Sequence, residues 1–277
     1  MKIDKYVASL GDFSNMKIAI TGCTSGVGLE LFHHLAKGHA KLVLLALEDD
    51  TAQKLKEQYP EEEIDIIHYD QSSYQLIEEA VNELLKRHKD IDVVALNAGV
   101  LGLNGVTKDG YPKTIGINYF GTKHFIDYVS PKIKKNIKFV IQGSFVAGFK
   151  LKKNVNLLDP KIEKFDQYNI SKIYLEAYFY KLYKENKYPN IEYVLTEPGL
   201  TGTGITTNLN AVYRKGGKYF LKWFFHSPKK ASLTLLTGIS NKAKNGDFII
   251  PRGGFGLSGY PKIKTFPRKR RRLELLE

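Results

Sequence analysis

Residues 18–28 read Ile18-Ala19-Ile20-Thr21-Gly22-Cys23-Thr24-Ser25-Gly26-Val27-Gly28. The apolar run before Gly22 is typical of a strand buried on both faces, and apolar residues recur with helical spacing after Gly28. Glycines let a backbone approach a ligand closely, and the first turn of a helix favours an anion such as a pyrophosphate. The spacing Gly-x-x-x-Gly-x-Gly therefore predicts a dinucleotide-binding turn. A glycine-rich turn without a ligand is the alternative that these residues leave open.

The composition fits one large α/β protein. The chain has 277 residues, of which 43% are apolar and 26% are charged, enough for a single domain with a sizeable core. Its one cysteine excludes an internal disulfide framework and fits a reducing compartment. No stretch resembles a secretory signal or reaches the ~20 apolar residues of a membrane-spanning helix. We therefore expect a cytoplasmic protein.

Strand-like and helix-like segments alternate along the chain, which predicts a doubly wound parallel sheet of the Rossmann type with helices on both faces. We expect a single domain of about seven strands over residues 1–277. Its expected parts include an N-terminal extension at 1–15, a substrate lid at 200–227 and a basic tail at 266–277. Long helices are expected over 110–134 and 166–185, and the strands at 16–20, 41–47, 64–69, 91–96, 139–142, 191–196 and 247–251.

Ligands of such sheets bind at the carboxyl ends of the strands. Asp70 follows the third expected strand, where it can accept a hydrogen bond from an adenine amino group or cap the next helix. Small or polar residues also follow the next three strands. They are Asn97-Ala98-Gly99, Gly143-Ser144 and Pro198-Gly199-Leu200.

Tyr168 and Lys172 lie four residues apart on an expected helix and share one face. An ammonium beside a phenol lowers the phenol's pKa from ~10 towards neutrality, which makes the phenol a usable general acid and base. The spacing alone does not select this pair, because it recurs elsewhere. The recurrences are Tyr119/Lys123, Tyr128/Lys132, Tyr180/Lys184, Tyr183/Lys187 and Tyr260/Lys264.

The order of the motifs selects Tyr168. The glycine turn, Asp70, Asn97-Ala98-Gly99, Asn118, Ser144, Tyr168-x-x-x-Lys172 and Pro198-Gly199 follow one another along the chain. In this set, over about residues 16–251, the sequence resembles the short-chain dehydrogenase/reductase family. The stretch Gly253-Gly254-Phe255-Gly256-Leu257-Ser258-Gly259-Tyr260-Pro261-Lys262, and Gly143-Ser144 in place of a Ser-Ser pair, resemble its retinol-dehydrogenase-like and protochlorophyllide-reductase-like branch.

The resemblance implies an NAD(P)-dependent oxidoreductase that transfers a hydride between the nicotinamide and a carbonyl or alcohol carbon. The implied catalytic residues are Asn118, Ser144, Tyr168 and Lys172. The implied cofactor contacts are Gly22, Cys23, Thr24, Ser25, Gly26, Val27, Gly28, Glu48, Asp70, Gln71, Asn97, Ala98, Gly99, Tyr168, Lys172, Pro198, Gly199, Leu200 and Thr203. For Thr203, a helix cap is an equal alternative.

Each implied catalytic residue has a role. Tyr168 exchanges a proton with the substrate oxygen, and Ser144 donates a hydrogen bond to the same oxygen. Lys172 lowers the tyrosine pKa and holds the nicotinamide ribose, while Asn118 holds a water that connects Lys172 to solvent. The alternative to an enzyme is a dinucleotide-binding sensor or scaffold without turnover, against which an intact set of four residues argues.

The choice between NAD and NADP depends on the end of the second strand. Glu48, Asp49 and Asp50 follow that strand, and no basic residue accompanies them. These acids would repel a 2′-phosphate, so we expect a preference for NAD, which a lysine from elsewhere in the chain would reverse.

The formal net charge of +13 allows a nucleic acid or membrane partner, or a lysine-rich solvated surface. We expect the basic run at 268–272 to be a solvated tail, and we predict no nucleic-acid partner and no metal. Residues 213–225 interleave lysines with aromatics and are expected to cover a fairly apolar substrate; helix packing and peripheral membrane contact are the alternatives. A homodimer or homotetramer is expected through the helices at 110–134 and 166–185.

Overall fold

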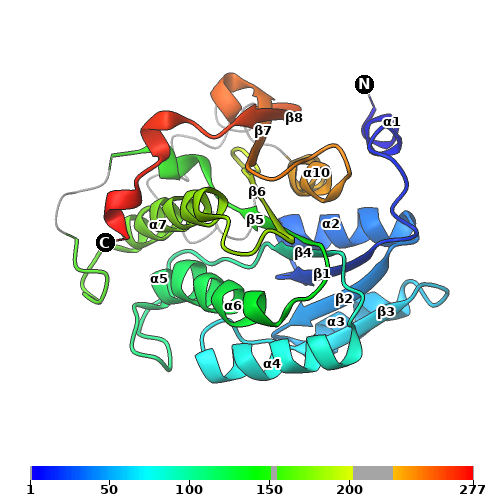
Figure 1. Ribbon diagram of the computed structural model, residues 1–277, viewed down its shortest axis with the longest axis horizontal. Helices are drawn as coiled ribbons and strands as arrows, with labels where there is room; N and C mark the ends of the chain where they lie inside the picture. Colours follow the sequence, from blue (N-terminus) through cyan, green and yellow to red (C-terminus); the bar gives the residue numbers. More distant parts are fainter. Residues whose placement is uncertain (1, 151–154, 202–226, 277) are drawn as a thin grey trace, which may run out of the picture.

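The computed structural model describes residues 2–150, 155–201 and 227–276, and contains one eight-stranded sheet. The strand order is β3-β2-β1-β4-β5-β6-β7-β8 (Figure 1). All neighbouring strands are parallel except β7 and β8, which are antiparallel. The strands are β1 (Lys17–Thr21), β2 (Lys41–Ala46), β3 (Ile64–His68), β4 (Val93–Leu96), β5 (Ile137–Gln142), β6 (Ile191–Thr196), β7 (Asp247–Gly253) and β8 (Ser258–Thr265).

Helices cover both faces of the sheet (Figure 1). Within β1, Ile18 and Ile20 belong to the core on one face and Ala19 to the core on the other, as expected of a strand buried on both sides. The first face is covered by α2 (Gly26–Lys37), α3 (Asp49–Glu57) and α10 (Pro228–Ile239). The second face is covered by α4 (Tyr74–Arg87), α6 (Thr122–Val129) and α7 (Lys164–Glu185). The predicted doubly wound sheet is confirmed.

The structure adds two elements at the ends of the expected fold. The strand β8 pairs along β7 as an antiparallel edge, and its lysines and proline are typical of an edge strand rather than of the buried runs that the sequence pattern detects. The short helix α1 (Ile3–Ala8) contacts α10, and Tyr6 Oη lies 2.9 Å from Thr237 Oγ1. No helix in the described ranges is long and apolar enough to cross a membrane.

The single long helix expected over 110–134 is wrong. The structure has a short helix, α5 (Lys113–Ile115), then a π-helical turn (Gly116–Gly121), and then α6. The π turn is stabilised from outside, because Gln71 Nε2 donates to Ile117 O at 2.7 Å and to Thr122 Oγ1 at 3.0 Å. Gly121 permits this approach, since a Cβ there would lie 2.3 Å from Gln71 O.

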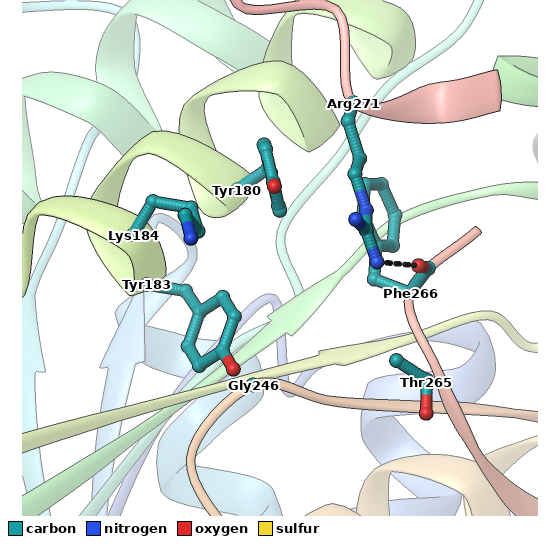
Figure 2. A pocket seen from close by; sticks show the side chains of 7 residues that line it. All are labelled: Tyr180, Tyr183, Lys184, Gly246, Thr265, Phe266 and Arg271. Atoms are coloured by element: carbon teal, nitrogen blue, oxygen red, sulfur yellow. Dashed lines mark hydrogen bonds between the residues drawn. The ribbon is translucent and has the colours of Figure 1, made fainter. Parts of the chain in front are cut away.

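The carboxyl-terminal segment 266–276 packs along α7. Phe266 is buried and meets the rings of Phe179 and Phe248 edge-on. The guanidinium of Arg271 lies over the ring of Tyr180, 5.1 Å from its centroid, and donates to Phe266 O at 3.1 Å. These residues line a small pocket (Figure 2). The expectation that the basic run at 268–272 is a solvated tail is therefore wrong at Arg271. Aromatic packing of Phe266 and Tyr180 anchors the segment to the domain.

Candidate active site

The glycine turn joins β1 to α2 at the carboxyl edge of the sheet. Gly22 has φ +65°, and a Cβ on it would lie 2.8 Å from Ala98 Cα. A Cβ on Gly28 would lie 2.1 Å from Gly22 O, so the backbone forms a cradle that has no room for side chains. Within the described residues, Ser25 caps α2 without a side-chain hydrogen bond. The opening N–H groups of α2 therefore border the cradle, as an anion-binding turn requires.

The motif after β4 is tied to the same turn. Asn97 Nδ2 donates to Gly22 O at 2.9 Å and to Thr21 O at 3.1 Å. The backbone N–H groups of Asn97 and Ala98 both donate to Thr21 Oγ1 at 3.0 Å. The structure thus brings Asn97-Ala98-Gly99 and the glycine turn together, and the Asn97 amide fixes their relative position.

Cys23 lies in the turn and is buried. Burial raises the pKa of its thiol to about 12, so Cys23 stays neutral at physiological pH. A neutral thiol does not repel a pyrophosphate. The bare cradle, the open helix terminus and this neutral side chain together fit a dinucleotide.

The ends of β2 and β3 contribute acidic side chains. Glu48 is exposed and accepts from Thr51 Oγ1 at 3.2 Å, and Asp49 lies 3.2 Å from the ring of His68. Asp70 accepts from the N–H of Ser72 at 2.8 Å. The alternative that Asp70 caps the next helix is wrong, because Ser73 is the N-cap of α4. The side chain of Gln71 is hydrogen-bonded to the π turn described above.

Asn118 lies in the π turn and is fully buried. Its side chain accepts from Val100 N at 2.8 Å, and it donates to Val100 O at 2.9 Å and to Ser171 Oγ at 3.1 Å. These bonds connect the loop after β4 to α7. Asn118 therefore aligns two of the segments that carry the predicted site.

Ser144, Tyr168 and Lys172 converge where β5 ends against α7. Ser144 is buried, and its side chain lies close enough to the Tyr168 phenol to lower the pKa of that phenol. Lys172 is also buried; its Nζ donates to Gln142 O at 2.8 Å and lies 5.9 Å from the centroid of the Tyr168 ring. Three of the four predicted catalytic residues thus form one cluster, and Asn118 contacts α7 next to it.

The electrostatics of this cluster differ from the expectation. Burial raises the pKa of Tyr168, and the negative charge of Glu197 adds to this effect, while the hydrogen bond with Ser144 opposes it. The predicted lowering of the Tyr168 pKa by Lys172 is therefore wrong, because Lys172 is directed at Gln142 O. Burial lowers the pKa of Lys172 to about 8, although the charge of Glu176 opposes the shift.

The loop after β6 closes this edge of the sheet. Leu200 N donates to Leu257 O at 3.1 Å, and a Cβ on Gly199 would lie 2.5 Å from that same oxygen. Pro198-Gly199-Leu200 is thereby fastened to the residues that follow β7. Thr203, most of the expected lid at 200–227 and the aromatic segment 213–225 lie outside the described residues.

The structure also brings charged residues to the site that the motifs did not select. Glu176 and Glu197 are buried behind Ser144, and Arg270 donates hydrogen bonds to both. Glu176 follows Lys172 by four residues on one helix, a spacing that places it on the same face. Nothing in the pattern of 268–272 indicates which of its cations is turned inward.

Comparisons with known proteins identify a family and relatives that this chain resembles. A model of the short chain dehydrogenase family matches residues 16–214. The short chain dehydrogenase/reductase mfmJ of Annulohypoxylon moriforme is 27% identical over 259 residues, covering 84% of this chain and 75% of that protein. The 11-beta-hydroxysteroid dehydrogenase A of Sesamum indicum is 24% identical over 202 residues, covering 70% of this chain and 55% of that protein.

Solved structures share the fold. An uncharacterised protein from Mycobacterium paratuberculosis superimposes with a TM-score of 0.77 at 17% identity, covering 97% of this chain and 92% of that chain. A short-chain dehydrogenase from Streptomyces avermitilis superimposes with a TM-score of 0.60 at 20% identity, covering 80% of this chain and 82% of that chain.

Proposed function

Because the chain belongs to the short chain dehydrogenase family of NAD(P)-dependent oxidoreductases, we propose that it interconverts a carbonyl and an alcohol at Ser144, Tyr168 and Lys172. The observation that carries this proposal is the meeting of the Ser144 side chain, the Tyr168 phenol and the buried Lys172 Nζ, which lies 5.9 Å from the centroid of the Tyr168 ring. The dinucleotide supplies or accepts the hydride when it is bound. The cradle around Gly22 and Gly28 is the region proposed to hold its pyrophosphate.

The protein's own contribution is to move a proton and to hold the substrate oxygen. A raised pKa keeps the Tyr168 phenol protonated at neutral pH, so Tyr168 can give its proton to the oxygen of a carbonyl that is being reduced. Ser144 donates a hydrogen bond to the same oxygen and stabilises the charge that develops there. Lys172 offers a donor for ribose hydroxyls, and Asn118 aligns α7 with the loop after β4.

A pair of tyrosine variants on α7 tests this assignment. Tyr168→Phe is expected to reduce turnover of a panel of aldehydes and ketones at least about 100-fold, because it removes the acid, while NADH and NADPH bind as in the wild type. Tyr183→Phe is the matched control, since Tyr183 stands in the same Tyr-x-x-x-Lys spacing but is 37% exposed. Wild-type turnover by Tyr168→Phe would contradict the assignment. A wild-type protein that binds both dinucleotides and turns over nothing would favour the sensor alternative.

The cradle is tested separately with Gly28→Ala. A methyl group there meets Gly22 O at 2.1 Å, so the turn must move. The variant is expected to lose binding of both dinucleotides in a calorimetric titration while it keeps the far-ultraviolet circular dichroism of the wild type. Unchanged affinity would rule out the cradle as the binding site.

We propose NAD as the preferred dinucleotide. The support is the exposed Glu48 with Asp49 beside it at the end of β2, where a 2′-phosphate would meet negative charge. Dissociation constants for NADH and NADPH, measured with Glu48→Gln alongside, test this preference. Tighter binding of NADPH to the wild type would reverse it.

A fairly apolar substrate and self-association complete the proposal. Phe149 is 46% exposed and Leu103 is 36% exposed, and Phe149 ends the loop that begins at Ser144. We expect the catalytic efficiency to rise with the chain length of an aldehyde series. We also propose a homodimer or homotetramer that uses α6 and α7, for which light scattering coupled to size exclusion provides the mass.

A further inference from the structure

Arg270 joins two buried carboxylates. Its Nε donates to Glu176 Oε2 at 2.8 Å, and its Nη2 donates to both Glu176 and Glu197. The side chains of Glu176 and Glu197 are 1% and 4% exposed, and that of Arg270 is 13% exposed. We call these three residues the Arg270 cluster.

The Arg270 cluster lies directly behind the proposed catalytic residues. Three consecutive backbone positions at the end of β5 each meet one charged side chain. Gln142 O accepts from Lys172, Gly143 faces Glu176, and Ser144 O accepts from Arg270 Nη2 at 3.3 Å. The cluster therefore contacts the same turn that presents the Ser144 hydroxyl to Tyr168.

We propose that Arg270 is a positioning residue of the reaction, which balances the negative charge of the Glu176–Glu197 pair behind Lys172 and fixes the backbone of Ser144. This inference rests on the function proposed above, in which Tyr168 is the acid and Ser144 holds the substrate oxygen. Arg270 lies 94 residues from Glu176 and 126 from Ser144 in the sequence, so only the folded carboxyl-terminal segment brings it there.

Burial strengthens the electrostatic interactions among the charged groups at this junction. Two carboxylates in a low-dielectric site repel each other and attract the nearest ammonium, which here belongs to Lys172. Three charged side chains surround this junction. Glu176 on α7 acts on Lys172, Glu197 after β6 acts on Tyr168, and Arg270 from the carboxyl-terminal segment is paired with both carboxylates. Without Arg270, the negative potential at Tyr168 and Lys172 increases, and the active ionisation state is reached at a different pH.

A second arginine of the same segment also fixes the backbone of the turn after β5. Arg272 Nη1 donates to Ala147 O at 3.2 Å, and its Nη2 donates to Phe149 O at 3.0 Å. The segment thus contacts the turn after β5 at Ser144, Ala147 and Phe149. The packing of Phe266 and the contact of Arg271 with Tyr180 hold the segment against α7 from the other side (Figure 2).

The test compares two arginines of one turn. Arg270→Met removes the cluster's cation, and Arg268→Met removes an exposed guanidinium two residues away. The assay uses the dinucleotide that the wild-type protein prefers and a panel of aldehydes and ketones. Under these conditions Arg270→Met is expected to lower kcat by about 10- to 100-fold. We expect little change in the dissociation constant of the dinucleotide and an alkaline limb of the kcat profile that moves to higher pH, because Tyr168 must be protonated to act as the acid. Arg268→Met is expected to match the wild type within about twofold. A folded Arg270→Met with the kcat and pH profile of Arg268→Met would overturn the proposal.

Glu197→Gln keeps the proposal testable if Arg270→Met does not fold, because the change is isosteric and leaves Arg270 paired with Glu176. Removing the negative charge of Glu197 lowers the pKa of Tyr168, so the alkaline limb is expected to move to lower pH. An unchanged pH profile would overturn the electrostatic role. Arg270→Lys is expected to restore the wild-type profile with only part of kcat, since a lysine keeps the charge but not the geometry of the guanidinium. If Arg270→Lys loses as much kcat as Arg270→Met and shows the same shift of the pH profile, the electrostatic role is contradicted as well.

Tyr168→Phe, measured in the same assay, separates this inference from the function on which it rests. If Tyr168→Phe keeps wild-type turnover, the proposed function fails and the role of Arg270 fails with it. If Tyr168→Phe is inactive while Arg270→Met behaves as Arg268→Met does, the function stands and only the role of Arg270 is refuted.

Discussion

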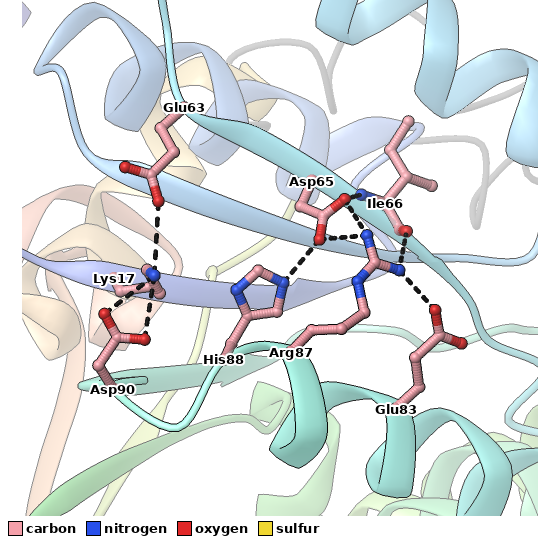
Figure 3. Close-up of polar contacts among 8 residues, drawn as sticks. All are labelled: Lys17, Glu63, Asp65, Ile66, Glu83, Arg87, His88 and Asp90. Carbon is pink, nitrogen blue, oxygen red and sulfur yellow. Dashed lines mark hydrogen bonds and ion pairs between the residues drawn. The ribbon is translucent and has the colours of Figure 1, made fainter.

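The two edges of the sheet both carry clusters of opposite charge, but they place them in different surroundings. At the amino ends of the strands, Lys17 pairs with Glu63 and Asp90, and Asp65 pairs with Arg87 and His88 (Figure 3). The side chains of Glu63 and Asp90 are more than half exposed. At the carboxyl ends, the Arg270 cluster is almost fully buried. The first arrangement is partly open to solvent, whereas the second places buried charge next to the proposed chemistry.

The stabilising contributions of the two edges depend on pH in opposite directions. Burial would raise the pKa of Asp65, but hydrogen bonds from His88 and the Ile66 N–H, together with the charge of Arg87, lower it. Burial raises the pKa of Glu176 to about 8; Arg270 opposes this shift and Glu197 adds to it. The amino edge therefore loses stabilisation in acid, and the carboxyl edge loses it as the pH rises.

The largest expected contrast is in stability. Arg270→Met leaves the buried carboxyl groups of Glu176 and Glu197 without their cation and hydrogen-bond donor, and is expected to lower the free energy of unfolding by about 3–5 kcal/mol. Arg87→Met removes a guanidinium from the amino edge, where the Arg87 side chain is 38% exposed, and is expected to cost about 0–1 kcal/mol. Urea unfolding of both variants at neutral pH measures the difference. Equal losses would show that burial does not distinguish the two clusters.

The next contrast is in the pH dependence of that free energy. Because the folded-state pKa of Glu176 is raised from 4.5 to about 8, the folded protein binds more protons between these values, and stability falls as pH rises through this window. Glu176→Gln is expected to remove a fall on the order of 2–4 kcal/mol. The lowered pKa of Lys172 acts only above about pH 8, where stability rises with pH, so it does not mask the effect.

Asp65→Asn is the matched variant at the amino edge. The pKa of Asp65 is lowered in the folded state, so its contribution is present above its ordinary value of 3.8 and is lost as pH falls through the folded value. The variant is expected to flatten the acid side of the stability profile and to leave the window of Glu176 unchanged. A change in the neutral window instead would mean that the two edges are coupled.

The sequence predicted the parts of the fold and site that depend on local pattern. Each strand and its following helix form a neighbouring unit, so apolar periodicity and the spacing of Gly22, Gly26 and Gly28 were enough to predict the doubly wound sheet. It did not predict the π turn around Asn118, because that turn needs a hydrogen bond from Gln71, far away in the chain. The position of Arg270 was missed for the same reason, since its partners are distant in the sequence and its neighbours carry the same charge.

The smallest expected contrast concerns one methyl group at each edge. A Cβ on Gly143, at the carboxyl edge, would lie 3.1 Å from Glu176 Oε1 and 3.3 Å from Thr196 O, so Gly143→Ala presses on the Arg270 cluster. We expect a loss of about 1–3 kcal/mol in stability, together with a lower kcat if Glu176 is displaced. Gly38 precedes β2 at the amino edge; its nearest atom, His34 O, would lie 3.4 Å from a Cβ, and its φ of −93° suits any residue. Gly38→Ala is therefore expected to be neutral or to stabilise the protein by up to about 1 kcal/mol. If Gly143→Ala proved as benign as Gly38→Ala, the turn after β5 would have room to relax, and its close packing against Glu176 would not explain why a glycine stands at this position.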